Sequence, residues 1–177
     1  MDNISLRALT ETDITKTLSW HNRDDIKNLY AGHPFPVNIE MESDWYDKIL
    51  KSNFPTTVFG IELVKDAELI GLSLLKKIDL INRKAEIAIY IGDTGQRGKG
   101  FAHSAAFQTM KFAFQQLGLN RLYLYVIKSN TAAFNLYKKL GFLKEGELTS
   151  SLFRNGVYHN EYVMGMLVTD FKSKYDL

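Results

Sequence analysis

Alternating apolar and polar positions mark the β-strands in the first half of the chain. Residues 4–9 alternate in this way, and the runs 56–64, 68–77 and 85–91 are rich in β-branched and other apolar residues. Alternation with a period of two places successive side chains on opposite faces of a strand, and polar turns separate the last three runs. The pattern predicts one strand near the N-terminus followed later by a three-stranded meander.

Helical spacing of the apolar residues fills the interval between these strands. An acidic residue follows Thr10 by three positions, as in a capping box, and predicts a helix over residues 10–20. Residues 23–30 predict a second short helix. The two prolines in residues 31–36 cannot continue it, and helical spacing resumes over residues 42–50. We therefore expect a loop between helices here.

The second half of the chain predicts two helices that alternate with strands. Residues 101–117 have one apolar helical face, residues 121–127 form a buried strand, and residues 130–140 form a shorter helix. The pair Asn155 and Gly156 lies between two strand-like runs, which is a strong signal for a β-hairpin. The expected order is β-α-α-β-β-β-α-β-α-β-β.

Composition narrows the class of protein. The chain has 177 residues, of which 45% are hydrophobic and 24% charged, and no linker or repeat interrupts it, so we expect one globular domain over residues 1–177. The absence of cysteine excludes disulfides, thiolate metal sites and a cysteine nucleophile. No secretory signal or membrane-length apolar run is present, which predicts a cytoplasmic protein without a membrane partner. A net charge of +2 does not favour nucleic-acid binding.

A glycine-rich loop carries the most informative chemistry. Residues 95–100 contain three glycines and lie directly between a predicted strand and the long predicted helix. Glycines allow close approach of a ligand, and a helix N-terminus favours an anion, so a pyrophosphate fits here. A Walker loop would need Ser or Thr where Gly100 stands, and a dinucleotide fingerprint would need a small residue where His103 stands. ATP hydrolysis and NAD binding are both disfavoured.

Three segments stand in a recognisable order around this loop. They are the strand 85–91, the loop pattern Arg97-x-x-Gly100-x-Ala102, and the segment 130–142. Together they resemble the GNAT superfamily of N-acetyltransferases, and the RimJ/RimL-type branch that includes spermidine acetyltransferases. The resemblance implies an α/β (α+β) GNAT fold, in which helices flank a central mixed, mostly antiparallel sheet. It also implies acetyl-CoA as the cosubstrate and no metal.

The resemblance implies two catalytic residues. In such enzymes an amine attacks the thioester directly, so that one group must accept a proton and another must protonate the leaving thiolate. Tyr137 matches the family's general acid, and Glu86 matches a glutamate that acts as general base in part of the superfamily. The helix pattern alone would also fit Tyr137 as a core aromatic, and Glu86 would also fit the solvated face of a strand.

The same resemblance implies the groups that bind acetyl-CoA. Backbone groups of the strand would bond the pantetheine arm and the thioester, Asn130 would bond the arm, and the loop and helix start would hold the phosphates. We read Arg97 and Lys99 as phosphate-facing cations and His103 as a contact at the end of the loop. The expected residues are Ile89, Tyr90, Ile91, Arg97, Gly98, Lys99, Gly100, Phe101, Ala102, His103 and Asn130.

The sequence predicts an acetyl-CoA-dependent transfer to a primary amine, with the acceptor left open among polyamines, protein N-termini, amino sugars and other small amines. The alternative is a non-catalytic CoA-binding or regulatory module of the same fold. By resemblance, the acceptor residues should come from the N-terminal helices and their loop, and the protein should form a homodimer or larger homo-oligomer. The acceptor candidates are Trp20, Asn22, His33, Phe35, Glu40, Glu42 and Trp45.

Overall fold

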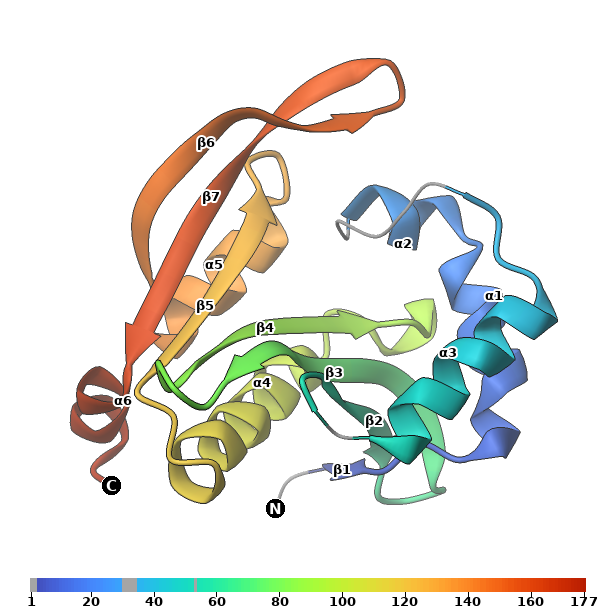
Figure 1. The fold of residues 1–177 in the computed structure, drawn as a ribbon, viewed down its shortest axis with the longest axis horizontal. Helices are drawn as coiled ribbons and strands as arrows, with labels where there is room; N and C mark the ends of the chain where they lie inside the picture. The colour runs from blue at the N-terminus through green and yellow to red at the C-terminus, as the bar shows by residue number, and fades with distance from the viewer. Residues whose placement is uncertain (1–2, 30–34, 53) are drawn as a thin grey trace.

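The computed structural model describes residues 3–29, 35–52 and 54–177 (Figure 1). In the described residues the elements follow the predicted order, except that three helices rather than two follow the first strand and a further helix follows the last strand. Short 3₁₀ segments lie at Glu11–Asp13 and Thr94–Gln96. The strands and helices are β1 (Ile4–Arg7), α1 (Ile14–His21), α2 (Asp24–Leu29), α3 (Ile39–Lys51), β2 (Thr57–Leu63), β3 (Glu68–Asp79), β4 (Lys84–Ile91), α4 (Phe101–Lys111), β5 (Arg121–Ile127), α5 (Thr131–Leu140), β6 (Leu143–Arg154), β7 (Val157–Leu167) and α6 (Val168–Tyr175).

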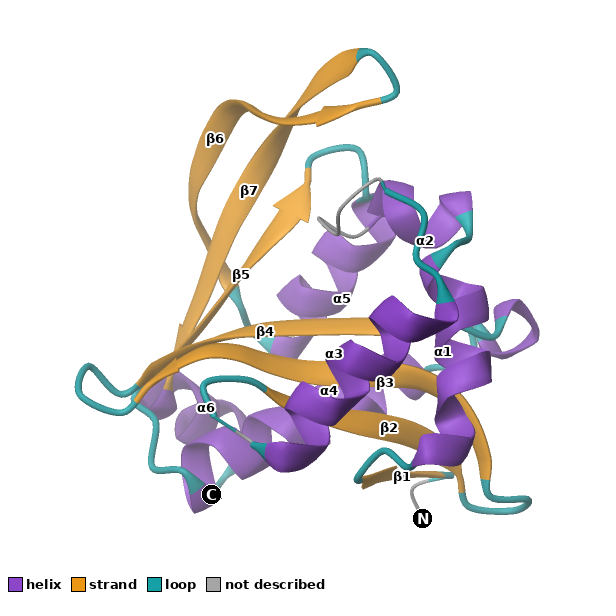
Figure 2. Ribbon diagram, turned by 45° about the vertical axis from the view of Figure 1, so that its right-hand side comes forward, coloured by secondary structure: helices purple, strands orange, loops and turns teal. Residues whose placement is uncertain are grey.

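The strands form one mixed sheet in the order β1-β2-β3-β4-β5-β7-β6. All neighbouring strands are antiparallel except β4 and β5, which run parallel and pair only from Lys84–Arg121 to Glu86–Tyr123. Beyond that point β5, β7 and β6 turn away from β2–β4, as both views show (Figure 2). The expected fold class is confirmed, and the sheet is split in its middle.

Two hydrophobic cores lie on opposite faces of the sheet, because side chains alternate along each strand. Along β4, Ile87, Ile89 and Ile91 pack into the core that contains α4, α5 and α6. Tyr90 packs into the second core, with Trp20 of α1 and Tyr46 of α3. β4, which lies beside the split, therefore presents one set of side chains to the core of α4, α5 and α6 and the other set to the core of α1 and α3.

Two elements differ from the sequence prediction. The helix predicted over residues 101–117 becomes a π-helical turn at Phe112–Gln116 before Gly118, which has a φ of +62°, ends it. The C-terminal helix α6 was not predicted, because it is short and mostly polar apart from Phe171. Phe171 is 1% exposed, and its ring lies 5.0 Å from that of Phe114. Phe171 thus holds α6 on the first core, together with the partly buried Val168 and Tyr175.

Gly92 is required where α1 crosses the end of β4. A Cβ at this position would lie 2.1 Å from Cδ2 of Trp20, whose side chain is 4% exposed and cannot move aside easily. We expect Gly92→Ala to lower the free energy of unfolding by about 1 to 3 kcal/mol, the usual cost of overpacking. Urea denaturation followed by tryptophan fluorescence measures the change.

Gly146→Ala is the matched control, since a Cβ there meets nothing within 4 Å and the residue lies outside the left-handed region. Equal stability of the two variants would contradict close packing of Trp20 on Gly92.

Candidate active site

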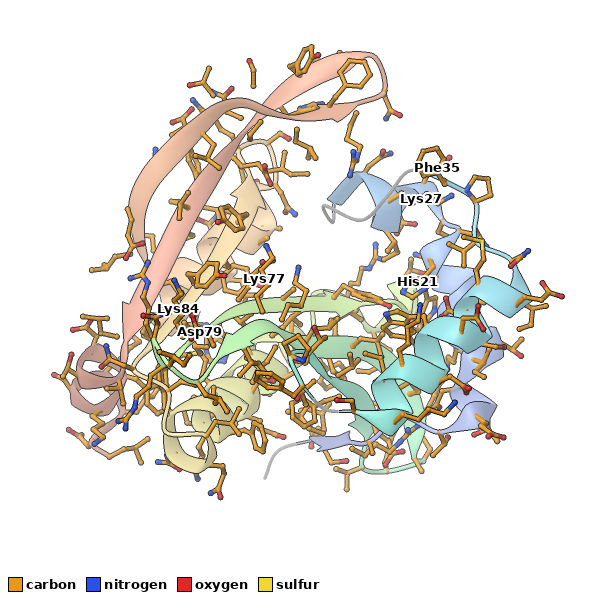
Figure 3. All side chains as sticks on the ribbon, in the orientation of Figure 1. His21, Lys27, Phe35, Lys77, Asp79 and Lys84 are labelled. Atoms are coloured by element: carbon orange, nitrogen blue, oxygen red, sulfur yellow. The ribbon has the colours of Figure 1, made fainter. Side chains whose placement is uncertain are left out.

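A cavity of about 750 Å³ opens where β4 and β5 separate. Its walls come from α1, α2 and α3 on one side, from β3 and β4 below, and from β5, α5, β6 and β7 on the other side. Figure 3 shows His21 and Lys27 on the helical side, and Lys77 on β3 across from them. Of the predicted catalytic and cofactor-binding residues, the structure brings five to the cavity: Glu86, Ile89, Tyr90, Asn130 and Tyr137.

Tyr137 lies on α5, which is fixed at its start by Asn130. The side chain of Asn130 caps the helix by accepting a hydrogen bond from the Ala133 N–H, 3.1 Å away. The Tyr137 side chain is 6% exposed, and its hydroxyl has a backbone hydrogen bond from Ile89. Burial raises the pKa of Tyr137 far above its usual value despite that bond. At neutral pH the phenol is a protonated group held against β4.

Glu86 lies in the cavity wall as an ion-paired carboxylate. Lys76, its direct partner across β3 and β4, has its Nζ 2.5 Å from Oε1, and the Lys77 Nζ lies 3.0 Å from Oε2. The ladder is irregular after Lys76 and Lys77 has a φ of +51°, which brings neighbouring lysines to one carboxylate. Burial acts to raise the pKa of Glu86, but the two lysines outweigh it and the pKa is lowered.

The glycine loop joins the end of β4 to the start of α4. Gly98 and Gly100 have φ values of +76° and +86°, which only glycine adopts without strain, and a Cβ at either would project into open space. The N–H groups of the first turn of α4 have no acceptor within the helix, as at every helix start. Open space in front of an α-helix N-terminus fits the pyrophosphate of acetyl-CoA.

The remaining predicted cofactor residues lie in and around this loop, outside the cavity lining. Arg97 turns back onto the protein, where Nε donates to the Ile91 carbonyl oxygen at 2.9 Å and Nη1 lies 2.7 Å from the Asp25 carboxylate. The hydrogen bonds from Arg23 and, to a smaller extent, from Arg97 outweigh the effect of burial and lower the pKa of Asp25 to about 2. Lys99 bonds Gln96, and burial lowers the pKa of His103.

The structure places only some of the acceptor candidates from the N-terminal helices in the wall of the cavity. Glu42 and Trp45 line the cavity. Trp20 is buried beside Gly92, Asn22 bonds the backbone of Val37, and Phe35 and Glu40 are exposed. His33 lies outside the described residues.

Sequence reasoning missed several residues of the cavity, among them His21, Lys76 and Lys77. No local motif marks these residues, because they meet at the cavity only through contacts between separate elements. Within the described part of the chain, no group of three or more His, Asp or Glu side chains could hold a metal ion. No helix in that part is long and apolar enough to cross a membrane.

Comparisons with known proteins agree on one family. A family model for the acetyltransferase (GNAT) domain matches residues 3–143. Spermidine N(1)-acetyltransferase of Escherichia coli K12 is 36% identical over 158 residues, which cover 89% of this chain and 82% of that protein. The putative ribosomal N-acetyltransferase YdaF of Bacillus subtilis is 32% identical over 117 residues, covering 65% of this chain and 63% of that protein.

A solved structure has the same fold over nearly its whole length. Spermidine N-acetyltransferase from Vibrio cholerae, in complex with CoA and spermine, superposes with a TM-score of 0.90 at 29% sequence identity. The match covers 97% of this chain and 99% of that one. The chain therefore belongs to the GNAT acetyltransferase family and is an acetyl-CoA-dependent N-acetyltransferase.

Proposed function

We propose that residues 1–177 form one catalytic unit that acetylates the primary amine of a small molecule by direct attack of the amine on the thioester. The observation that carries this proposal is the Tyr137 hydroxyl, held by Ile89 in a cavity at the split of the sheet. The single sheet, which includes strands before and after the loop of residues 95–100, supports treating the chain as one unit.

Each part of the chain has a separate task in this mechanism. The N-terminus of α4 and the loop amides hold the phosphates, with Gly98 and Gly100 leaving room for them. Backbone groups of β4 at Ile89 and Tyr90 hold the pantetheine arm and orient the thioester that acetyl-CoA supplies. Tyr137 then gives its proton to the departing sulfur, and neither a metal nor a covalent enzyme intermediate is needed.

The charges around the cavity support an acceptor with few positive charges. Six charged side chains among the described residues line it, three of each sign: Lys27, Lys76, Lys77, Glu42, Glu86 and Glu161. Each glutamate already has a partner inside the protein. Glu86 has the two lysines, Glu42 has His21 at 2.8 Å, and Glu161 accepts from Ser151 at 2.9 Å. A polycation would have to break these pairs, whereas an amine that also carries hydroxyl or anionic groups would not.

A polyamine is the second candidate acceptor, because the relatives from Escherichia coli and Vibrio cholerae are spermidine acetyltransferases. We further infer that the chain belongs to the RimJ/RimL-type branch and works in the cytoplasm. The order of its three motifs supports the branch.

Tyr137→Phe tests the proton donor. We expect kcat to fall roughly 10²- to 10⁴-fold, the usual contribution of a positioned acid, while the KM for acetyl-CoA changes little. Release of free CoA thiol, followed with a thiol reagent, measures the rate without background because the chain has no cysteine.

Tyr175→Phe is the matched control, since the Tyr175 hydroxyl donates to the Leu140 carbonyl oxygen away from the cavity. Full turnover by Tyr137→Phe would show that another group protonates the thiolate.

An acceptor panel separates the two candidate substrate classes. We expect amino sugars or other amines that carry hydroxyl or anionic groups to give a higher kcat/KM than spermidine, because the three glutamates around the cavity already have partners within the protein. Thiol release in parallel wells with each amine, and without any, gives the comparison. A clear preference for spermidine would establish the polyamine reading instead.

We also propose that two copies associate through the hairpin of β6 and β7. The hairpin extends away from the rest of the sheet, β6 is an edge strand, and Phe153, Val157 and Tyr158 are all more than half exposed. Light scattering after size exclusion should give a mass above that of one 20.3 kDa chain. Phe153→Asp should lower that mass, and a wild-type mass of 20.3 kDa would contradict the proposal.

A further inference from the structure

A chain of three hydrogen-bonding side chains leads from the interior to the cavity. The Glu42 carboxylate is 2% exposed and accepts from the Thr17 hydroxyl at 2.6 Å. Its other oxygen lies 2.8 Å from Nδ1 of His21, and Nε2 of the same ring lies 3.2 Å from the Tyr90 hydroxyl. Glu42, His21 and Tyr90 come from α3, α1 and β4, and all three line the cavity.

The chemistry of the outer members fixes the direction of these bonds. A carboxylate only accepts, so Nδ1 of His21 carries the proton that bonds Glu42. In the neutral ring Nε2 then has no proton, and Tyr90, which burial with Glu42 and Tyr46 nearby keeps protonated by raising its pKa well above its usual value, can donate to it. Nε2 of His21 is then the acceptor. The sequence of hydroxyl, imidazole and carboxylate is the arrangement that removes a proton from the hydroxyl group in serine hydrolases.

Acetyl transfer needs a group that accepts a proton from the attacking amine. A primary amine has a pKa near 10, as lysine does, so at neutral pH it arrives as an ammonium ion and cannot attack. Glu86 was the base expected from the sequence, but Lys76 and Lys77 stabilise its charged form and make it a weak acceptor. His21 has its Nδ1 proton bound by a carboxylate, a contact that stabilises the imidazolium formed when Nε2 gains a proton.

The hydrogen-bonded side chains of Glu42, His21 and Tyr90 lie on one face of β4, and the proton donor Tyr137 lies on the other. Tyr90 packs with the core beside α1 and α3, whereas Tyr137 packs with the core beside α4 and α5. Ile89, whose backbone bonds Tyr137, is the residue directly before Tyr90. A thioester held on β4 at the split would therefore meet an amine from the His21 side and release its sulfur on the Tyr137 side.

We propose that His21 is the proton acceptor for the attacking amine, reached through the Tyr90 hydroxyl and held in position by Glu42; this rests on the acetyltransferase function. The amine gives one proton to the Tyr90 oxygen while the Tyr90 proton passes to Nε2 of His21. The neutral nitrogen forms its bond to the carbonyl carbon, the carbon–sulfur bond breaks with its electron pair on sulfur, and sulfur takes the Tyr137 proton. The nitrogen loses a second proton as the amide forms, and this proton replaces the one that Tyr137 gave up, so that the excess proton remains on His21. Glu42 is a positioning residue.

Other ionisable groups near His21 must be included in any test that varies pH. Glu42 and Tyr46 face this region from α3, Tyr90 from β4, and Trp45 packs its ring 5.5 Å from the imidazole. Lys27 of α2 lines the same cavity, as do the ion-paired Lys76, Lys77 and Glu86 farther along the strands. Because Glu86 is the competing base, it is substituted in parallel.

The experiment compares His21→Gln, Tyr90→Phe and Glu86→Gln, with His159→Gln as the matched control in β7, outside the cavity lining. Thiol release is measured from pH 6 to 10 with the best acceptor of the wild type. We expect His21→Gln and Tyr90→Phe each to lower kcat roughly 10²- to 10⁴-fold at neutral pH, with the loss shrinking as pH approaches the pKa of the amine. Glu86→Gln should lose much less.

A second variant keeps the test decisive if His21→Gln is unstable. His21→Ala leaves space at the cavity wall, and added imidazole should restore turnover in proportion to its concentration, which a purely structural histidine would not allow. Acetyl-CoA binding, followed as a rise in Tm, checks that each variant is folded. Full turnover by His21→Gln, or a loss that is the same at every pH and is not rescued, would overturn the proposal. An inactive wild type would instead refute the acetyltransferase function itself.

Discussion

The site depends on a single constraint: the parallel pairing between β4 and β5 ends after Glu86 and Tyr123. Backbone donors and acceptors in the middle of a sheet normally satisfy one another, so an early end to the ladder leaves β4 to find other partners. The Tyr137 hydroxyl is one such partner, through Ile89. The same separation makes the cavity, since β5 and β7 carry one wall away while β3 holds β4 in place. An interruption in the sheet thus supplies both the space and the bonding groups.

The alternation of side chains along β4 then distributes the chemistry. Tyr90 packs with the N-terminal helices, and Glu86 pairs with Lys76 and Lys77 of β3, whereas Ile87 and Ile89 pack into the core of α4 and α5. At the split only β4 lies between the two faces of the sheet. Substrates bound on its two sides are therefore close together, although the side chains around them belong to separate cores. Direct transfer between two bound molecules needs this arrangement, since both must reach the same carbonyl carbon at once.

The elements that could be predicted are those decided by residues close together in the sequence. The strand over residues 121–127, the helix over residues 130–140 and the turn at Asn155 and Gly156 are all as expected, because each is decided within a few positions. What the sequence could not reveal depends on tertiary contacts. Glu42 and His21 are 21 residues apart on different helices, and Lys77 reaches Glu86 only through an irregularity in the ladder. The helix α6 depends on Phe171 finding a place on the core rather than on its own propensity.

Asp25 connects the glycine loop to the helix α2, which forms part of the cavity wall. Its carboxylate holds Arg97 of the glycine loop and Arg23 before α2, and the next two residues of α2, Ile26 and Lys27, form part of the cavity wall. An anion that drew Arg97 away from Asp25 would remove one of the two cations that hold this helix. Such a displacement would link the free energies of binding at the loop and in the cavity, and such linkage is reciprocal. Each substrate would then change the affinity of the other by the same factor, whichever of the two bound first.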